Sequence, residues 1–257
     1  MTGAWTADVE DSGACASRGP WRMQRFVQDA KTASTASVVL ITGTDTGVGK
    51  TWLGCALGRA LVRSGRRVVA IKPLETGCPR APSAEEDGVR LARATGQSAP
   101  AHALMRFRDP VAPPEAADRE GRGIDYAELL SLVRTYSEGH EVTLVEGAGG
   151  LMSPLTWKHN ALDLARDLGA NVILVAPDKL GTVNHSVMSL KLLALSGLDL
   201  AGLVLIAPAQ PDASTGSNAA AIARLSEGIR IALVPRSEDC RAISESMQET
   251  VRALRLG

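Results

Sequence analysis

The sequence has no excess of charge of either sign. Lysine plus arginine and aspartate plus glutamate each number 28 in 257 residues, so the formal net charge is zero and the pI is about 6.9. Proteins that bind nucleic acid or an anionic membrane through their overall charge carry a basic excess. The composition therefore indicates neither nucleic acid nor a membrane as a partner.

Long apolar runs and targeting segments are also missing. No uninterrupted apolar segment reaches the roughly 18 residues of a membrane-spanning helix, and the N-terminus lacks the apolar core of a signal peptide. We therefore expect a soluble protein that works in the cytoplasm.

Cysteine and histidine form none of their usual functional arrangements. Cys15, Cys55, Cys78 and Cys240 make no Cys-x-x-Cys pair and have no histidine-rich partner segment, which argues against a zinc site. Reduced, structural thiols are the expected state in the cytosol. No Ser/His/Asp or Cys/His combination indicates a nucleophilic hydrolase either.

The first 36 residues differ in amino-acid composition from the rest of the chain. They are rich in small and polar side chains, and three acidic residues among the first 11 argue against a transit peptide. We expect residues 1–36 to form a flexible N-terminal extension and residues 37–257 to form one domain. Met23 is a candidate alternative start, and a docked helix over residues 21–30 is the alternative to a flexible extension.

From residue 37 onward, short apolar runs alternate with helical patterns. Expected strands cover residues 38–42, 67–72, 142–146, 172–176, 201–206 and 229–234, and expected helices cover residues 49–64, 84–95, 125–137, 160–168, 182–195, 217–226 and 241–254. Continuous Val, Ile and Leu runs are typical of strands buried on both faces. They predict one α/β domain with a mainly parallel sheet flanked by helices on both faces. Between residues 79 and 122 we expect one helix in an otherwise long loop.

A glycine-rich segment lies between the first expected strand and the first helix. It consists of Gly43, Thr44, Asp45, Thr46, Gly47, Val48, Gly49, Lys50 and Thr51. Glycines let backbone N–H groups surround phosphate oxygens, the lysine adds positive charge, and the final hydroxyl can bind Mg²⁺. Five residues separate the first glycine from the Gly-Lys-Thr triplet, where the standard pattern has four. The segment predicts a P-loop domain. Its five-residue spacing restricts the candidates to the P-loop families that share this spacing.

Two further strand ends carry charge. Lys72 closes the second expected strand; alone it would be read as a lysine extending from a strand end, but beside a phosphate loop it can neutralise a transferred phosphoryl group. Glu146 ends the third strand before a glycine cluster, where a carboxylate can bind Mg²⁺, although the glycines alone would be consistent with a simple turn. In the helix that begins near Thr182, this residue is either only an N-cap or part of a carboxylate-binding helix start.

Four motifs in the same order resemble the dethiobiotin synthetase family. They are the segment from Gly43 to Thr51 with its five-residue spacing, Lys72-Pro73-x-x-Thr76-Gly77, Val145-Glu146-Gly147-Ala148-Gly149-Gly150, and Leu180-Gly181-Thr182-Val183-Asn184-His185. The resemblance extends from about residue 38 to residue 206.

The resemblance implies an ATP-dependent cyclo-ligase of biotin biosynthesis. Its substrates would be 7,8-diaminopelargonate, CO₂ or bicarbonate, and ATP, its cofactor Mg²⁺, and its assembly a homodimer with the substrate site at the interface. The implied catalytic residues are Lys50 and Lys72. The implied nucleotide-binding residues are Thr44, Asp45, Thr46, Gly47, Val48, Gly49, Lys50, Thr51 and Glu146. The implied substrate-binding residues are Thr46, Lys72, Thr76, Gly147, Ala148 and Gly149, together with Asn184, which comes from the partner subunit. The implied Mg²⁺ ligands are Thr51, Asp87 and Glu146.

Two positions depart from the family pattern. Where many members have Ser-Pro-His, this chain has Ala112, Pro113 and Pro114, so any role of that histidine is absent. Some members recognise adenine with an asparagine after the strand that ends at residue 206, but here Ala207 and Pro208 follow. Looser nucleotide choice is therefore a hypothesis.

Two other families share this kind of loop. Cobyrinate-type amidoligases usually carry a glutaminase domain, for which this chain is too short. In partitioning and cell-division ATPases a signature lysine would fall at Asp45, which makes that alternative a poor match.

Overall fold

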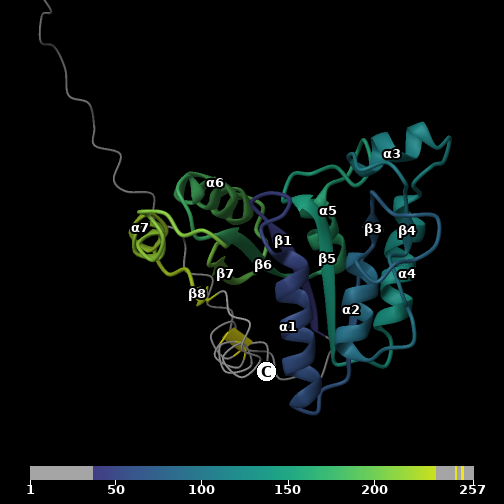
Figure 1. Cartoon of the computed structure of the whole chain (residues 1–257), viewed down its shortest axis with the longest axis horizontal. Coiled ribbons are helices and arrows are strands. Elements are labelled where there is room, and N and C mark those ends of the chain that lie inside the picture. Colours follow the sequence, from purple (N-terminus) through teal and green to yellow (C-terminus); the bar gives the residue numbers. More distant parts are fainter. Residues whose placement is uncertain (1–36, 236–246, 248–249, 252–257) are drawn as a thin grey trace, which may run out of the picture.

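The computed structural model describes residues 37–235 together with Met247, Thr250 and Val251 (Figure 1). The expected N-terminal extension and most of the helix expected over residues 241–254 lie outside the described residues. The three described residues within that last segment are helical, and Met247 is buried in the core.

Six parallel strands form the central sheet in the order β2-β5-β1-β6-β7-β8. Their bounds are β1 Ser37–Gly43, β2 Val68–Ile71, β5 Val142–Gly150, β6 Asn171–Pro177, β7 Leu200–Ile206 and β8 Ile231–Val234. All six expected strands are present, and the prediction of a mainly parallel sheet is confirmed. The inner strands are buried on both faces, as their unbroken apolar sequences predicted.

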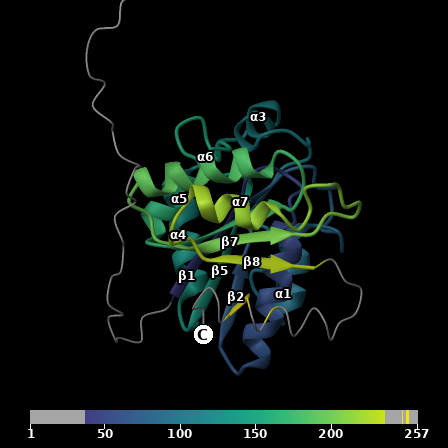
Figure 2. The ribbon, with the colours of Figure 1, turned by 90° about the vertical axis from the view of Figure 1, so that its left-hand side faces the viewer.

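Helices cover both faces of the sheet. On one face lie α1 (Lys50–Arg63) and α2 (Asp87–Thr95); on the other lie α4 (Tyr126–Ser137), α5 (Ala161–Leu168), α6 (Thr182–Leu195) and α7 (Asn218–Leu225). Figure 2 shows α6 and α7 above the sheet and α1 below it. The expected three-layer arrangement is confirmed.

Local sequence signals determine where several helices begin. The Asp125 carboxylate accepts N–H bonds from Ala127 and Glu128 and thereby caps α4. Asn160 and Asp163 form a capping box at the start of α5. These side chains satisfy N–H groups that have no partner inside the helix.

The segment expected to be mostly loop between residues 79 and 122 holds more structure than its sequence predicted. It contains α3 (Pro113–Arg119), and β4 (Met105–Arg106), which pairs in parallel with β3 (Leu74–Glu75). Pro113 and Pro114 occupy the first positions of α3, where a missing N–H costs nothing. The helix expected from residue 84 starts at Asp87 instead.

The topology gathers the strand ends that carry the expected site residues. Strand β1 lies between β5 and β6, so the chain crosses from one side of β1 to the other. Ligands of open α/β sheets bind beside the carboxyl ends of strands at such a switch point. In the part of the chain that the structure describes, no helix is both long enough and apolar enough to cross a membrane.

Candidate active site

The loop from Gly43 to Lys50 connects β1 to α1 in a conformation that requires glycine. Gly47 and Gly49 have φ values of 73° and 102°, which side-chain-bearing residues rarely adopt. A Cβ on Gly49 would also lie 2.7 Å from Cδ1 of Ile206. Because no side chain caps the start of α1, its first N–H groups are available to an anion.

Lys50 is almost fully buried at the start of α1. Only 6% of the residue is exposed, and its ammonium donates to the backbone oxygen of Asp45 at 2.9 Å. Burial, together with repulsion from Lys72, lowers the pKa of Lys50 to about 8. A phosphate at this position would remove the cost of that buried charge.

Lys72, Asp87 and Glu146 meet beside Lys50, although they come from three different elements. The Lys72 ammonium donates to Oε1 of Glu146 at 2.6 Å and to Oδ2 of Asp87 at 2.8 Å. The Thr51 hydroxyl lies 2.7 Å from Oδ1 of Asp87 and 2.9 Å from Oε1 of Glu146. We call these four side chains the ion-pair cluster. Three of them are the expected Mg²⁺ ligands, and the fourth is the expected catalytic lysine.

Burial and charge act against each other within the ion-pair cluster. Burial alone would lower the pKa of Lys72, but attraction to Glu146 and Asp87 outweighs it and holds that pKa above its ordinary value. Burial also raises the pKa of Glu146, which is only 1% exposed. Burial would raise the pKa of Asp87 as well, yet attraction to Lys72 holds it below its ordinary value. The lysine therefore keeps its proton.

The ion-pair cluster offers oxygen ligands of the kind that Mg²⁺ prefers. Oε2 of Glu146 is buried and has no hydrogen-bond partner among the described residues. An unpaired carboxylate oxygen inside a protein is costly unless a cation or donor meets it. Together with the Thr51 hydroxyl and the Asp87 carboxylate, it makes a set of hard donors that fits Mg²⁺.

The glycines after Glu146 let the end of β5 lie against the phosphate loop. A Cβ on Gly150 would lie 3.3 Å from the backbone oxygens of Gly43 and Thr44. Gly149 has a φ of 66°, and a Cβ there would lie 2.8 Å from Cβ of Ser153 and 3.6 Å from Oγ1 of Thr46. Gly149 thus lies beside Thr46 of the phosphate loop, whereas Gly147 lies beside Ile41 and Thr42 of β1.

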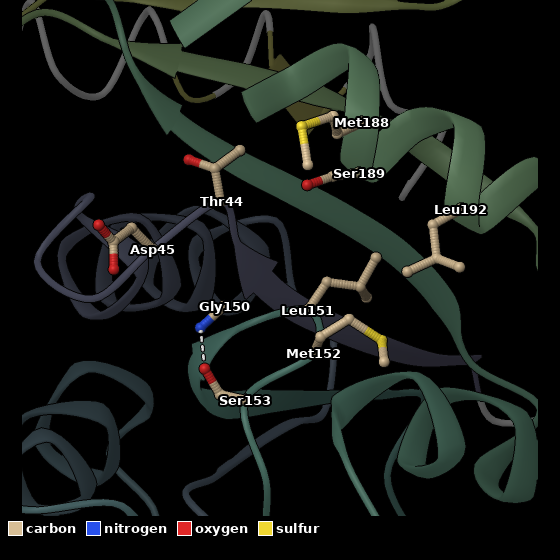
Figure 3. A pocket seen from close by; sticks show the side chains of 9 residues that line it. All are labelled: Thr44, Asp45, Gly150, Leu151, Met152, Ser153, Met188, Ser189 and Leu192. Atoms are coloured by element: carbon tan, nitrogen blue, oxygen red, sulfur yellow. Dashed lines mark hydrogen bonds between the residues drawn. The ribbon is translucent and has the colours of Figure 1, made fainter. Parts of the chain in front are cut away.

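A pocket of about 260 Å³ opens between the phosphate loop, the segment after β5 and α6 (Figure 3). Its lining residues are Thr44, Asp45, Gly150, Leu151, Met152, Ser153, Met188, Ser189 and Leu192. Polar groups line its loop side, and Leu151, Met152, Met188 and Leu192 make the rest apolar. We call it the α6 pocket. The sequence did not predict the contribution of α6, because nothing in its apolar pattern separates pocket-facing from core-facing residues.

Two expected substrate residues, Thr76 and Asn184, belong neither to the ion-pair cluster nor to the phosphate loop or β5. Thr76 follows β3 and is partly exposed. Asn184 lies in the first turn of α6, where its side chain is exposed. The structure therefore brings together the phosphate loop, Lys72, Asp87 and Glu146 within one chain, and it leaves Asn184 accessible from outside.

Comparisons with known proteins agree with this geometry. A family model described as an AAA domain matches residues 37–244. An ATP-dependent dethiobiotin synthetase BioD from Anaeromyxobacter dehalogenans (strain 2CP-C) is 41% identical over 204 residues, which cover 78% of this chain and 91% of the relative. The protein of the same name from Aquifex aeolicus is 37% identical over 201 residues, which cover 78% and 90%.

Solved structures of lower identity show the same fold. The septum site-determining protein MinD from Pyrococcus horikoshii, complexed with Mg-ADP, has a TM-score of 0.52 at 16% identity and covers 82% of this chain and 86% of its own. Cobyrinic acid a,c-diamide synthase from Mycobacterium smegmatis, with bound ADP and magnesium, has a TM-score of 0.50 at 16% identity and covers 86% and 94%. At this identity they support the fold alone.

The sequence relatives separate this chain from those structural neighbours. They share about two fifths of their residues with it over most of both lengths, and the motifs around Lys50, Lys72 and Glu146 meet in one site. The chain belongs to the dethiobiotin synthetase family.

Proposed function

We propose that this chain forms dethiobiotin from 7,8-diaminopelargonate, CO₂ and ATP, with Mg²⁺ as the cofactor. One substrate amine adds to CO₂ and loses a proton, which gives a carbamate. A carbamate oxygen then takes the γ-phosphoryl group, and ADP leaves. The second amine attacks the carbonyl carbon and loses its proton, so that the ureido ring closes and phosphate is expelled.

The observation that carries this proposal is the ion-pair cluster beside the phosphate loop. The carbamate, the mixed anhydride and the triphosphate are all anions, so charge stabilisation and positioning dominate the barrier. Lys50 and the N–H groups from Thr44 to Thr51 hold the phosphates. Lys72 holds the carbamate next to the γ-phosphate and neutralises the charge that develops during transfer.

Thr51, Asp87 and Glu146 would hold the Mg²⁺. When bound, the ion screens the negative charge of the phosphate oxygens. The two lysines and the two carboxylates of this region balance in charge, so a divalent cation would leave the site with a positive excess that suits a triphosphate. The near-complete burial of Lys72 and Glu146 excludes water from this pair, whereas the Asp87 side chain is 32% exposed.

The α6 pocket suits the remainder of the diamine. Its apolar wall matches a methylene chain, and its loop side, formed by Thr44, Asp45 and Gly150, suits the polar amino end. We assign the amino end to Thr46, Thr76 and Gly147 to Gly149 as well, on the family resemblance alone. We further propose a homodimer in which Asn184 of the partner subunit binds the distal carboxylate. The exposure of Leu180 and Met188, at 80% and 62%, supports a protein contact on this face.

The direct test is incubation with diaminopelargonate, bicarbonate and MgATP, with dethiobiotin detected by mass. A monoamine analogue is the matched control, because it can form a carbamate but cannot close the ring. We expect product from the diamine alone. A folded, nucleotide-binding preparation that makes no dethiobiotin would contradict the proposal.

Nucleotide choice is a separate proposal. Ala207 donates its backbone N–H to Val234 and has no polar side chain to offer a base. We therefore expect turnover with CTP or GTP within about tenfold of that with ATP, a difference of about 1.4 kcal/mol. A strong preference for ATP would contradict this expectation and would show that a group other than residue 207 recognises the adenine base.

We also propose that the protein works in the cytoplasm. Cys55 and Cys78 are buried free thiols, which is usual in a reducing compartment. Cell fractionation tests this, and recovery from an extracellular or envelope fraction would contradict it.

A further inference from the structure

Glu75 contacts the backbone of α2 from a different part of the chain. It ends β3, three residues after Lys72, and is only 9% exposed. Its two carboxylate oxygens accept the N–H groups of Asp87 at 2.6 Å and of Gly88 at 3.0 Å. These are the first two residues of α2, whose N–H groups have no partner within the helix. A carboxylate there also complements the positive end of the helix dipole.

The residue that immediately precedes α2 does not supply this cap. The Glu86 side chain makes no capping bond to the helix. Its oxygens instead accept bonds from the Ser83 N–H and from the Arg106 guanidinium, at 2.6 to 2.8 Å. Glu75 therefore replaces the local cap of α2.

A glycine allows this end of α2 to pack closely. A Cβ on Gly88 would lie 2.7 Å from the backbone carbon of His102, so a larger residue would displace the helix start. The position of the α2 start is thus fixed by two contacts: the close packing of Gly88 against His102 and the bonds to the Glu75 carboxylate. Asp87 lies between them, and its side chain is the part of α2 that reaches Lys72 and Thr51.

Glu75 does not behave as a metal ligand itself. Its carboxylate, that of Glu86 and the Cys78 thiol lie within 4.8 Å of one another, a spacing that could hold an ion. However, both Glu75 oxygens already accept N–H groups, Glu86 is paired with Arg106, and burial raises the pKa of the Cys78 thiol to about 11. The carboxylate oxygens that could bind a metal ion are therefore already paired, and the thiol is protonated at neutral pH.

We propose that Glu75 is a positioning residue for the magnesium site. By capping α2 from β3, it holds the Asp87 carboxylate at the distance that Thr51 and Glu146 require. It acts through the backbone of Asp87 and does not contact substrate. This inference rests on the proposed role of Asp87 as a Mg²⁺ ligand.

Two variants of the full chain separate positioning from stability. Glu75→Gln preserves the shape but presents an amide N–H₂ to one of the two N–H donors, and Glu75→Ala removes both acceptors. Loss of a residue that orients a metal ligand typically weakens metal binding about 10- to 100-fold. We expect the Mg²⁺ concentration for half-maximal ATP binding, measured by calorimetry, to rise by about that factor. The KM for the diamine should change less than about twofold, since Glu75 does not touch substrate.

Asp125→Ala is the matched control, because the Asp125 carboxylate also caps a helix, α4, by accepting two backbone N–H groups, but it makes no bond to the ion-pair cluster. Both cap deletions should lower the Tm. Only the Glu75 variants should also reduce the extra rise in Tm that MgATP gives over ATP with EDTA. An equal reduction in Asp125→Ala would overturn the inference by showing a general stability effect.

The remaining outcomes are also decisive. If Glu75→Ala does not fold, Glu75→Gln carries the test, and wild-type Mg²⁺ dependence in that variant overturns the inference. If wild type binds ATP equally with and without Mg²⁺, the proposed metal site fails and this inference fails with it. If wild type requires Mg²⁺ and the Glu75 variants require it to the same extent, only the role of Glu75 is refuted.

Discussion

Two buried lysines in one site have opposite protonation tendencies because their neighbours differ. Lys72 lies between two carboxylates, so its pKa is raised. Among the described residues Lys50 has a backbone oxygen as its hydrogen-bond partner and no carboxylate, and burial lowers its pKa to about 8. Nucleotide phosphates would supply the charge that Lys50 lacks. At the residue scale, Lys72 holds two carboxylates together, and the proposed role of Lys50 is to bind phosphate.

Replacement of Lys72 tests its role directly. Lys72→Ala should lower kcat by at least about 100-fold, as removal of a charge-stabilising group does. It should also lower the free energy of unfolding by about 3–5 kcal/mol, because the buried carboxylate of Glu146 loses its partner. Rates measured at low temperature, with folding confirmed by circular dichroism, separate the two effects. Near-wild-type kcat would remove Lys72 from the reaction.

A glycine substitution measures the packing of the phosphate loop. Gly49→Ala should cost about 1–2 kcal/mol for its left-handed backbone and about 1–3 kcal/mol more for the contact with Ile206. Gly65→Ala is the control, because Gly65 has a φ of 86° but open space around its Cβ position. Denaturant unfolding of both variants gives the difference. Equal losses would mean that Ile206 moves aside without cost.

At the scale of elements, the start of α6 is tied to the loop that precedes α7. Oδ2 of Asp212 accepts the Leu180 N–H at 2.8 Å, and Oδ1 accepts bonds from the N–H and hydroxyl of Ser214. A buried neighbour, Asp178, accepts bonds from Gly216 in the same loop and from Asn218 at the start of α7. The segment expected to meet the substrate carboxylate is therefore held by polar contacts.

These contacts predict a pH dependence of stability. Bonds from Ser214 and Leu180 lower the pKa of Asp212 from 3.8 to about 2. The native state thus favours the ionised form, so its stabilisation is complete above the unfolded pKa and is lost as the pH falls from about 4 to about 2. Asp212→Asn should be less stable than wild type at pH 7, and the difference should shrink by pH 3. Denaturant unfolding at several pH values measures it, with the exposed Asp199→Asn as control; a pH-independent difference would contradict the assignment.

At the scale of the whole molecule, the site lies where the order of strands in the sheet reverses, beside β1. The chain runs from β1 to β2 and β5 on one side and then to β6, β7 and β8 on the other. The phosphate loop follows β1, the ion-pair cluster lies on the β2 and β5 side, and the α6 pocket is closed by the helix after β6. We therefore expect the phosphates and the carbamate on the β2 and β5 side of β1, and the methylene chain of the diamine on the β6 side.

That division predicts separable effects on the two substrates. Met188→Trp should fill much of the α6 pocket and raise the KM for the diamine at least about tenfold, equivalent to about 1.4 kcal/mol. The affinity for MgATP should change much less, because Met188 is not among the residues assigned to the nucleotide. Leu195→Trp is the control on the same helix, since Leu195 is 85% exposed and does not line the pocket. Equal effects of both variants, or weaker ATP binding, would refute this placement.

The sequence alone determined the order of strands and helices and the identity of the phosphate loop. Unbroken apolar runs identify buried parallel strands, and the glycine, lysine and threonine of the loop act through their own backbone and nearest neighbours. Both depend on residues close together in the chain. The motifs at Lys72 and Glu146 could be assigned for the same reason, because each ends a recognisable strand.

Only the tertiary structure decided how these pieces meet. The bonds from Lys72 to Asp87 and Glu146 span 15 and 74 positions, and the cap that Glu75 places on α2 spans 12 and 13. Such contacts depend on the crossing of strands and the packing of α2, which no local pattern encodes. No local pattern predicted α3, which begins at Pro113, or the α6 pocket, whose walls come from three separate segments.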